Sequence, residues 1–89
     1  MAEIIKKAVA GTMESSDVYV EIEPGTGGIE IHLESVVQQQ FGPVIETVVL
    51  EVLQDCGVES ASVNVIDRGA LDCVIRARVE TAVLRGKGD

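Results

Sequence analysis

The stretch SSDVYVEIE, residues 15 to 23, decides the fold of this chain. Two serines between acidic neighbours come first, and an alternating pattern follows. The apolar residues of that pattern are Val18, Val20 and Ile22, and the residues that alternate with them are Tyr19, Glu21 and Glu23. A two-residue period is typical of a strand that buries one face and exposes the other. We therefore predict a strand, and no helix, directly after the serines.

The residues before the serines can supply a partner for this strand. The segment AVA, residues 8 to 10, precedes Gly11 and fits a short strand. The segment ESSD, residues 14 to 17, would then form the exposed turn of a hairpin, where serine and aspartate are favoured. An alternative leaves residues 1 to 12 as an irregular lead-in.

The residues after the first alternating stretch repeat its pattern. The segment PGTGG, residues 24 to 28, is a cluster of turn residues, and IEIHLE, residues 29 to 34, alternates again. We interpret the two alternating stretches as a second hairpin. The glycine cluster lacks the lysine and the following helix of a phosphate-binding loop, so we interpret it as a turn.

A helix is predicted next, with an interruption near its start. Ser35 resembles a helix N-cap, with Gln38 as its capping-box partner. Gly42-Pro43 interrupts the pattern, because proline is tolerated only in the first turn of a helix. We therefore expect a short turn over residues 36 to 41 and a main helix that begins at Pro43.

The main helix is expected to run to Asp55, with Gly57 as its C-cap. Its apolar residues fall at helical spacing and are expected to face the core: Val44, Ile45, Val48, Val49, Val52 and Leu53. Three polar residues are expected to face outward: Glu46, Glu51 and Gln54.

The remaining chain predicts one more strand and one more helix. Residues 61 to 66 alternate and stop at Asp67-Arg68-Gly69. Residues 70 to 86 fit a strand in their first half but a helix over their full length, which favours the helix, with Asp72 as a possible cap. The predicted fold class is α+β: a small antiparallel sheet of three to four strands with two helices packed on one face, in the order ββ-β-α-β-α, as one domain over residues 1–89.

The composition of the chain excludes some classes of binding partner. Fifteen acidic residues against seven basic ones give a net charge of -8, which repels nucleic acid and anionic membranes, so basic protein surfaces are the expected partners. An aromatic share of 2% gives no platform for stacking bases. We find no apolar run long enough for a signal peptide or a membrane span, and we expect a cytoplasmic protein.

The chain offers little for catalysis or metal binding. Cys56 and Cys73 are too far apart for a CxxC pair, and we expect both to be reduced and at least half-buried. The single histidine, His32, is expected to face solvent. We therefore predict no catalytic and no metal-binding residue. The acidic residues beside Ser15 and Ser16 either cap amides of the turn, or one of the two hydroxyls is presented there to a modifying enzyme.

Three segments together resemble a known family. They are AVAGTMESSDV (residues 8–18), VVQQQFGPVIETVVLEVL (36–53) and GALDCVIRARVE (69–80). They are similar to the acyl carrier protein, or gamma subunit, of citrate lyase, and the resemblance covers nearly the whole chain. When AGTMES (residues 10–15) is matched to the motif of that family, the serine that carries the cofactor corresponds to Ser15. The family commonly has glycine at the next position, where this chain has Ser16.

The resemblance implies a role without catalysis. Ser15 would carry 2'-(5''-phosphoribosyl)-3'-dephospho-CoA through a phosphodiester, attached by a separate prosthetic-group transferase. The thiol of that group would hold acetyl and citryl thioesters while citrate is cleaved to acetate and oxaloacetate. The alpha subunit (acyl transferase) and beta subunit (citryl lyase) would perform the chemistry. Arg76 and Arg78 would contact the cofactor or a partner, or form an exposed pair on the last helix.

Two alternatives stay open beside this resemblance. The chain could be the carrier subunit of malonate decarboxylase, which uses a similar cofactor. It could also be an unmodified structural or regulatory α+β module of a complex.

Overall fold

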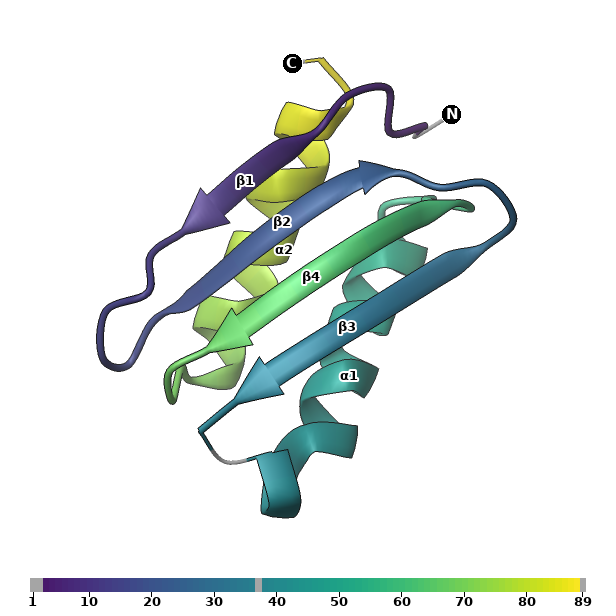
Figure 1. The fold of residues 1–89 in the computed structure, drawn as a ribbon. Coiled ribbons are helices and arrows are strands. Elements are labelled where there is room, and N and C mark those ends of the chain that lie inside the picture. The colour runs from purple at the N-terminus through teal and green to yellow at the C-terminus, as the bar shows by residue number, and fades with distance from the viewer. Residues whose placement is uncertain (1–2, 37, 89) are drawn as a thin grey trace.

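The computed structural model describes residues 3–36 and 38–88, which form four strands and two helices (Figure 1). In chain order the elements are β1 (Ala8–Gly11), β2 (Val18–Pro24), β3 (Ile29–Ser35), α1 (Gln38–Asp55), β4 (Ala61–Asp67) and α2 (Asp72–Gly86). This is an α+β fold with the predicted order of elements and no helical bundle, so the predicted α+β class is confirmed. The short strand β1 is present, and the irregular lead-in is wrong for residues 8 to 11.

The strand order of the sheet is β1-β2-β4-β3. Strand β2 pairs antiparallel with both β1 and β4, whereas β3 pairs parallel with β4. The expected all-antiparallel sheet is therefore wrong, and so is the expected hairpin of β2 with β3, because β4 lies between them. Alternation determines which face of a strand is buried, but it does not determine which strand lies beside it.

The glycine cluster allows the chain to cross the end of β4 on its way from β2 to β3. An added Cβ on Gly25 would lie 2.6 Å from the backbone nitrogen of Ala61, the first residue of β4. The amide of Ala61 also donates a hydrogen bond of 3.1 Å to the carbonyl of Gly28. The absence of a side chain at Gly25 therefore permits this close approach of two backbones.

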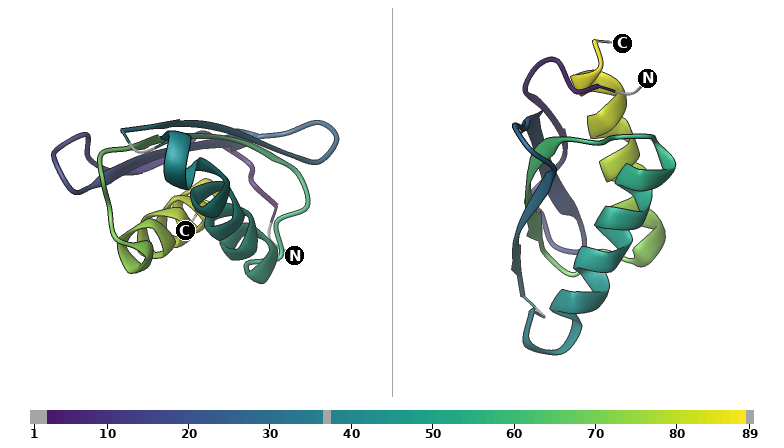
Figure 2. Two further views of the ribbon diagram at one scale, coloured as in Figure 1. Left: turned by 90° about the horizontal axis from the view of Figure 1, so that it is seen from below. Right: turned by 90° about the vertical axis from the view of Figure 1, so that its right-hand side faces the viewer.

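Both helices cover the same face of the sheet, as Figure 2 shows in two views. The core between the layers is aliphatic and holds the predicted apolar face of the strand after the serines. Its largest fully buried apolar side chains are Ile22, Leu53, Val18, Val20, Val49, Val63, Val65, Val79 and Val83. Side chains of the opposite strand face, such as Tyr19, Glu21 and Asn64, are only half-buried, since no helix covers them among the described residues.

Helix α1 begins at Gln38, five residues before the predicted start, and Pro43 lies inside it. Proline removes one helical hydrogen bond, and here that loss falls in the N-terminal part of the helix, where Pro43 and Val44 are exposed. Val44 is 58% exposed instead of buried, whereas the other predicted core positions of α1 are buried. The three polar side chains expected to face outward are exposed.

The end of α1 agrees with the prediction. Gly57 has φ 77°, and its amide donates to the carbonyl of Gln54. The amide of Val58 donates to the carbonyl of Leu53. These two bonds form the Schellman motif, in which glycine adopts the left-handed conformation just after the helix.

Two predicted helix caps are wrong. Ser35 is the last residue of β3, and its hydroxyl donates a hydrogen bond of 2.8 Å to Asp67. At α2 the N-cap is Leu71, which makes no side-chain cap bond, while Asp72 accepts from Arg76 one turn further along. Helix α2 itself confirms the preference for a helix over residues 70 to 86. Within the described residues, neither helix is long and apolar enough to cross a membrane.

Candidate attachment site at the hairpin tip

The two serines lie at the tip of the β1–β2 hairpin, as predicted. The amide of Asp17 donates a hydrogen bond of 3.1 Å to the carbonyl of Glu14, which closes a four-residue turn with Ser15 and Ser16 at its centre. Both serines are exposed. Ser16 has φ 66°, a left-handed conformation that glycine adopts more readily.

The loop after β4 holds the tip from one side. The amide of Ser16 donates to the carbonyl of Arg68, and the amide of Arg68 donates to the carbonyl of Asp17, both at 2.9 Å. These bonds extend the antiparallel pairing of β2 with β4 by one step beyond Val18 and Asp67. The turn is therefore attached to the sheet through its backbone.

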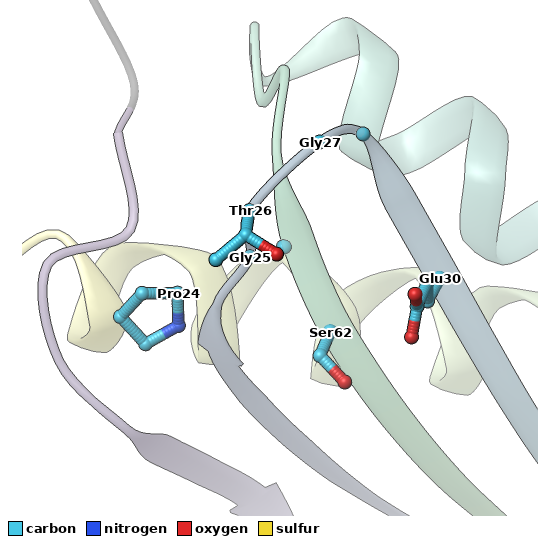
Figure 3. Close-up of a pocket in the computed structure, with 8 residues that line it drawn as sticks. Pro24, Gly25, Thr26, Gly27, Glu30 and Ser62 are labelled. Atoms are coloured by element: carbon cyan, nitrogen blue, oxygen red, sulfur yellow. The ribbon is translucent and has the colours of Figure 1, made fainter.

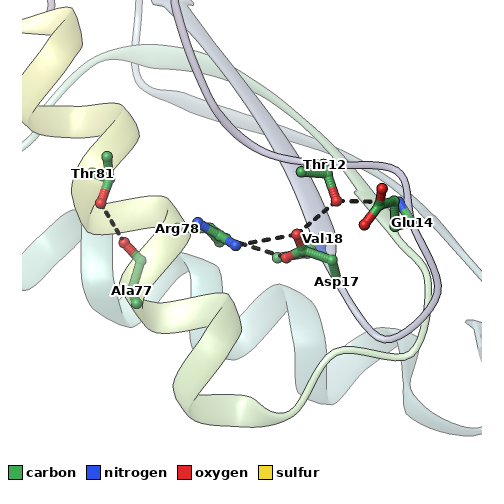
Figure 4. Close-up of polar contacts among 7 residues, drawn as sticks. All are labelled: Thr12, Glu14, Asp17, Val18, Ala77, Arg78 and Thr81. Atoms are coloured by element: carbon green, nitrogen blue, oxygen red, sulfur yellow. Dashed lines mark hydrogen bonds and ion pairs between the residues drawn. The ribbon is translucent and has the colours of Figure 1, made fainter.

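Asp17 holds the tip from the other side. One carboxylate oxygen accepts the Thr12 hydroxyl at 2.7 Å, and the other accepts the amide of Val18 at 2.7 Å. The guanidinium of Arg78, which reaches from α2, donates to both oxygens at 3.2 and 3.1 Å (Figure 4). A two-pronged contact of this kind fixes orientation as well as distance. The carboxylate thus joins Thr12, which follows β1, to β2 and α2.

These contacts change the titration of Asp17. The Thr12 hydroxyl contributes most, followed by the Val18 amide and then Arg78, and together they lower the pKa of Asp17 to about 2. Asp17 is therefore ionised at neutral pH and its oxygens are occupied. Asp17 therefore stabilises the turn through its contacts, whereas Ser15 is exposed to solvent.

Arg76 and Arg78, the two arginines of α2 singled out from the sequence, make separate contacts. Arg76 pairs with Glu51 of α1 at 2.8 Å and with Asp72 at 3.4 Å, and these carboxylates, Glu51 first, raise its pKa. Arg78 pairs with Asp17. Both side chains are 41% exposed, so the expected alternative of a solvent-facing pair is only partly right. The pairing of Asp17 with Arg78 was missed, because no local pattern links residues 61 positions apart.

The histidine and the two cysteines singled out from the sequence form no catalytic or metal-binding group with other described residues. His32 is exposed on β3, with Glu30 at 3.6 Å. Cys56 is half-buried, and its pKa is raised, mainly because burial disfavours the charged thiolate. Cys73 is exposed, so the prediction that it is at least half-buried is wrong. Over residues 3–36 and 38–88, no group of three side chains could hold a metal ion.

A small pocket lies under the glycine-rich crossing, at the opposite end of the sheet from the serines (Figures 1 and 3). Its lining includes the glycines, Thr26, Ser62 and the carboxylate of Glu30. Glu30 is the charged residue of this lining, and its sign is unfavourable for a phosphate. The pocket is the hollow beside a crossing strand connection, which agrees with the interpretation of this segment as a turn.

Comparison with known proteins identifies the family. The chain matches the family model described as malonate decarboxylase delta subunit (MdcD), an ACP family, over residues 5–86. It is 57% identical over 84 residues to citrate lyase acyl carrier protein 2 of Salmonella typhimurium, covering 93% of this chain and 87% of that protein. The citrate lyase acyl carrier protein of Albidiferax ferrireducens is 52% identical over 88 residues, with 98% and 90% covered. This chain belongs to the citrate lyase acyl carrier protein family.

The fold of this family member is also found in a solved assembly. A chain in the crystal structure of a Pseudomonas malonate decarboxylase hetero-tetramer in complex with malonate superposes with a TM-score of 0.81. The alignment covers 93% of this chain and 86% of that one, at 21% sequence identity. At this identity the likeness concerns the fold alone. The identities of more than 50% place the chain with the citrate lyase carriers, whereas the malonate decarboxylase chain, at 21% identity, is a distant relation.

Proposed function

We propose that this chain is a single-domain, non-catalytic carrier subunit of citrate lyase, with Ser15 as the attachment point of its prosthetic group. The single observation that carries the proposal is the exposed Ser15 hydroxyl, held on a turn that is fixed from both sides. The family membership supplies the role of a carrier. In this proposal the group is 2'-(5''-phosphoribosyl)-3'-dephospho-CoA, linked through a phosphodiester.

The residues of the tip fit a phosphodiester link. A modifying enzyme needs access to the hydroxyl oxygen from outside, and a residue at the centre of an exposed turn provides it. The Asp17 carboxylate cannot act as a base for Ser15 in this arrangement, since Thr12, Val18 and Arg78 occupy its oxygens. The prosthetic-group transferase would therefore supply the base. When bound, the group supplies a thiol that holds acyl groups as thioesters.

A fixed anchor for a flexible group suits a carrier. A group attached at Ser15 would hold its acyl cargo near each partner active site, and for short flexible tethers the effective concentration is on the order of millimolar. The hairpin bonds hold the start of the group in one place, so that its reach is set by the group itself. We propose that the group serves the alpha and beta subunits of citrate lyase in turn, in the cytoplasm, where both free cysteines stay reduced.

The net charge of -8 supports docking onto basic surfaces of those subunits. Charge of this kind acts on the rate and orientation of encounter more than on affinity. We therefore expect the association with the lyase subunits to weaken as the salt concentration rises.

The test is reconstitution. The modified protein is combined with the citrate lyase alpha and beta subunits, and oxaloacetate formation from citrate is followed; a parallel reaction with malonate decarboxylase subunits and malonate measures decarboxylation. We expect turnover of citrate with the modified wild-type protein and none with Ser15→Ala. Turnover of malonate alone would assign the chain to the other complex. Full citrate turnover with Ser15→Ala would show an unmodified structural subunit.

A further inference from the structure

Arg68 is the basic residue whose backbone lies directly beside the proposed attachment turn. It is opposite Asp17 in the extended β2–β4 pairing, and its carbonyl accepts the amide of Ser16. Its side chain is exposed. Gly69, which follows with φ 93°, turns the chain away toward α2, so that Arg68 is the first residue after β4 and lies at the hairpin tip.

The guanidinium of Arg68 is unoccupied by other side chains, in contrast to the other arginines. Arg76 and Arg78 each pair with carboxylates, and Arg85 donates to the carbonyl of Val9. The Arg68 side chain makes no ion pair and no hydrogen bond with any other residue that the structure describes. Its five donors are therefore available to an external anion.

The charge of the tip makes such a cation useful. Arg78 neutralises Asp17, which leaves the exposed carboxylate of Glu14 as a net negative charge beside the serines. A phosphodiester on Ser15 would add a second negative charge there. Without a cation these two charges would repel one another at short range. Arg68 is the residue placed to offset them, because guanidinium groups bind phosphate oxygens with paired donors.

We propose that Arg68 binds the phosphodiester formed on Ser15, and that it also helps to position the incoming phosphate during attachment. In that step the Ser15 oxygen forms a bond to a phosphorus of an activated phosphoanhydride form of the group, the anhydride P–O bond breaks, the leaving phosphate departs, and the hydroxyl proton passes to a base of the transferase. This proposal rests on the function proposed above, because it takes Ser15 as the modified residue. It assigns Arg68 a binding role and no role in breaking or making a bond. Arg78 remains committed to Asp17, and Arg76 to Glu51 and Asp72.

The first measurement needs no variant of Arg68. The side-chain Nε–Hε resonances of the arginines are recorded by NMR in the wild-type protein before and after attachment. We expect the Arg68 resonance to shift and its exchange with solvent to slow, while the Arg76 and Arg85 resonances stay in place. An unchanged Arg68 resonance in the modified protein would overturn the proposal, even if Arg68 variants were modified slowly, because Arg68 would then contact only the transferase.

The second measurement uses the rate of attachment by the purified transferase, followed by intact mass over a range of carrier concentrations. We expect Arg68→Gln to lower kcat/KM about tenfold, a loss typical of one charge-assisted contact, and Arg68→Lys to retain most of the rate. The matched control for the loss of one positive charge is Lys6→Gln. Lys6 is exposed and lies near Gly86, at the far end of the sheet from the serines. Thermal unfolding of each variant confirms that it is folded.

Ser15→Ala, assayed in parallel, separates the two proposals. Attachment to Ser15→Ala would contradict the proposed function itself. No attachment to Ser15→Ala, combined with a wild-type rate for Arg68→Gln and an unshifted Arg68 resonance, would contradict only the role of Arg68.

Discussion

Asp17 is the residue that joins the hairpin tip to the rest of the molecule. Its carboxylate contacts Thr12 of the tip, the amide of Val18 at the start of β2, and Arg78 of α2. Its side chain is only 15% exposed. The adjacent serines, in contrast, project from a turn whose position these contacts fix. A half-buried carboxylate that holds the turn and an exposed hydroxyl therefore lie two residues apart.

The lowered pKa of Asp17 predicts an acid-sensitive tip. A carboxyl whose pKa is lower in the folded state stabilises the protein above its unfolded pKa of about 4 and loses that contribution as the pH falls toward about 2. We expect the free energy of unfolding, measured by urea denaturation and circular dichroism, to decline over this interval in the wild-type protein. Asp17→Asn should be less stable at pH 7 and should show a smaller decline.

Glu14→Gln is the control for this prediction. It removes an exposed carboxylate from the same turn and should retain the wild-type decline between about pH 4 and pH 2. Identical pH profiles for Asp17→Asn and the wild type would contradict the contacts that the structure assigns to Asp17.

The elements themselves were largely predictable, whereas their arrangement was not. The period-two stretches became β2, β3 and β4, and the apolar spacing and Gly57 defined most of α1. The pairing of β3 with β4 could not be predicted, because both strands have one buried and one exposed face and would satisfy either neighbour. The early start of α1 was missed since a local rule places proline in the first turn, and this helix tolerates Pro43 beyond it.

The crossing of the β2–β3 connection over β4 gives a prediction at this scale. An added methyl group on Gly25 would meet the backbone of Ala61, so we expect Gly25→Ala to destabilise the protein by about 1–3 kcal/mol, as overpacking does. Gly27→Ala is the matched control, because nothing lies within 4 Å of its added Cβ. Thermal unfolding followed by circular dichroism measures both.

In a chain of this size, a loss of about 1 kcal/mol lowers Tm by roughly 4–8 °C. We expect a fall of at least this size for Gly25→Ala and a much smaller change for Gly27→Ala. Equal melting temperatures for the two variants would contradict the crossing and would favour a simple β2–β3 hairpin, in which neither glycine passes over a backbone.

The molecule as a whole has two distinct ends. The β1–β2 tip with Ser15 lies at one end of the sheet, and the first and last described segments of the chain meet at the other, where the amide of Ile5 bonds to the carbonyl of Gly86 (Figure 1). Fusion of a tag at either terminus would therefore leave the serines accessible. The aliphatic core supports the tip through α2, whose residues Val79 and Val83 pack in the core while Arg78 reaches Asp17.

The candidate site could be predicted only in part. The exposed position of Ser15 followed from local signals, namely a short strand, turn residues and a second strand. The contacts of Asp17 with Arg78 and of Ser16 with Arg68 join segments that are brought together only by the packing of α2 and β4 on the hairpin. Such contacts depend on the complete fold, and no single segment of the sequence carries a signal for them.

The most direct test of the central claim is to locate the prosthetic group by mass spectrometry. The protein is produced together with the attachment enzymes, and its intact mass and fragmented tip peptide are measured for the wild type, Ser15→Ala and Ser16→Ala. We predict one nucleotide-containing adduct on Ser15, present in the wild type and in Ser16→Ala and absent from Ser15→Ala. An adduct that persists in Ser15→Ala, or that maps to Ser16 in the wild-type protein, would contradict the claim that Ser15 is the tether.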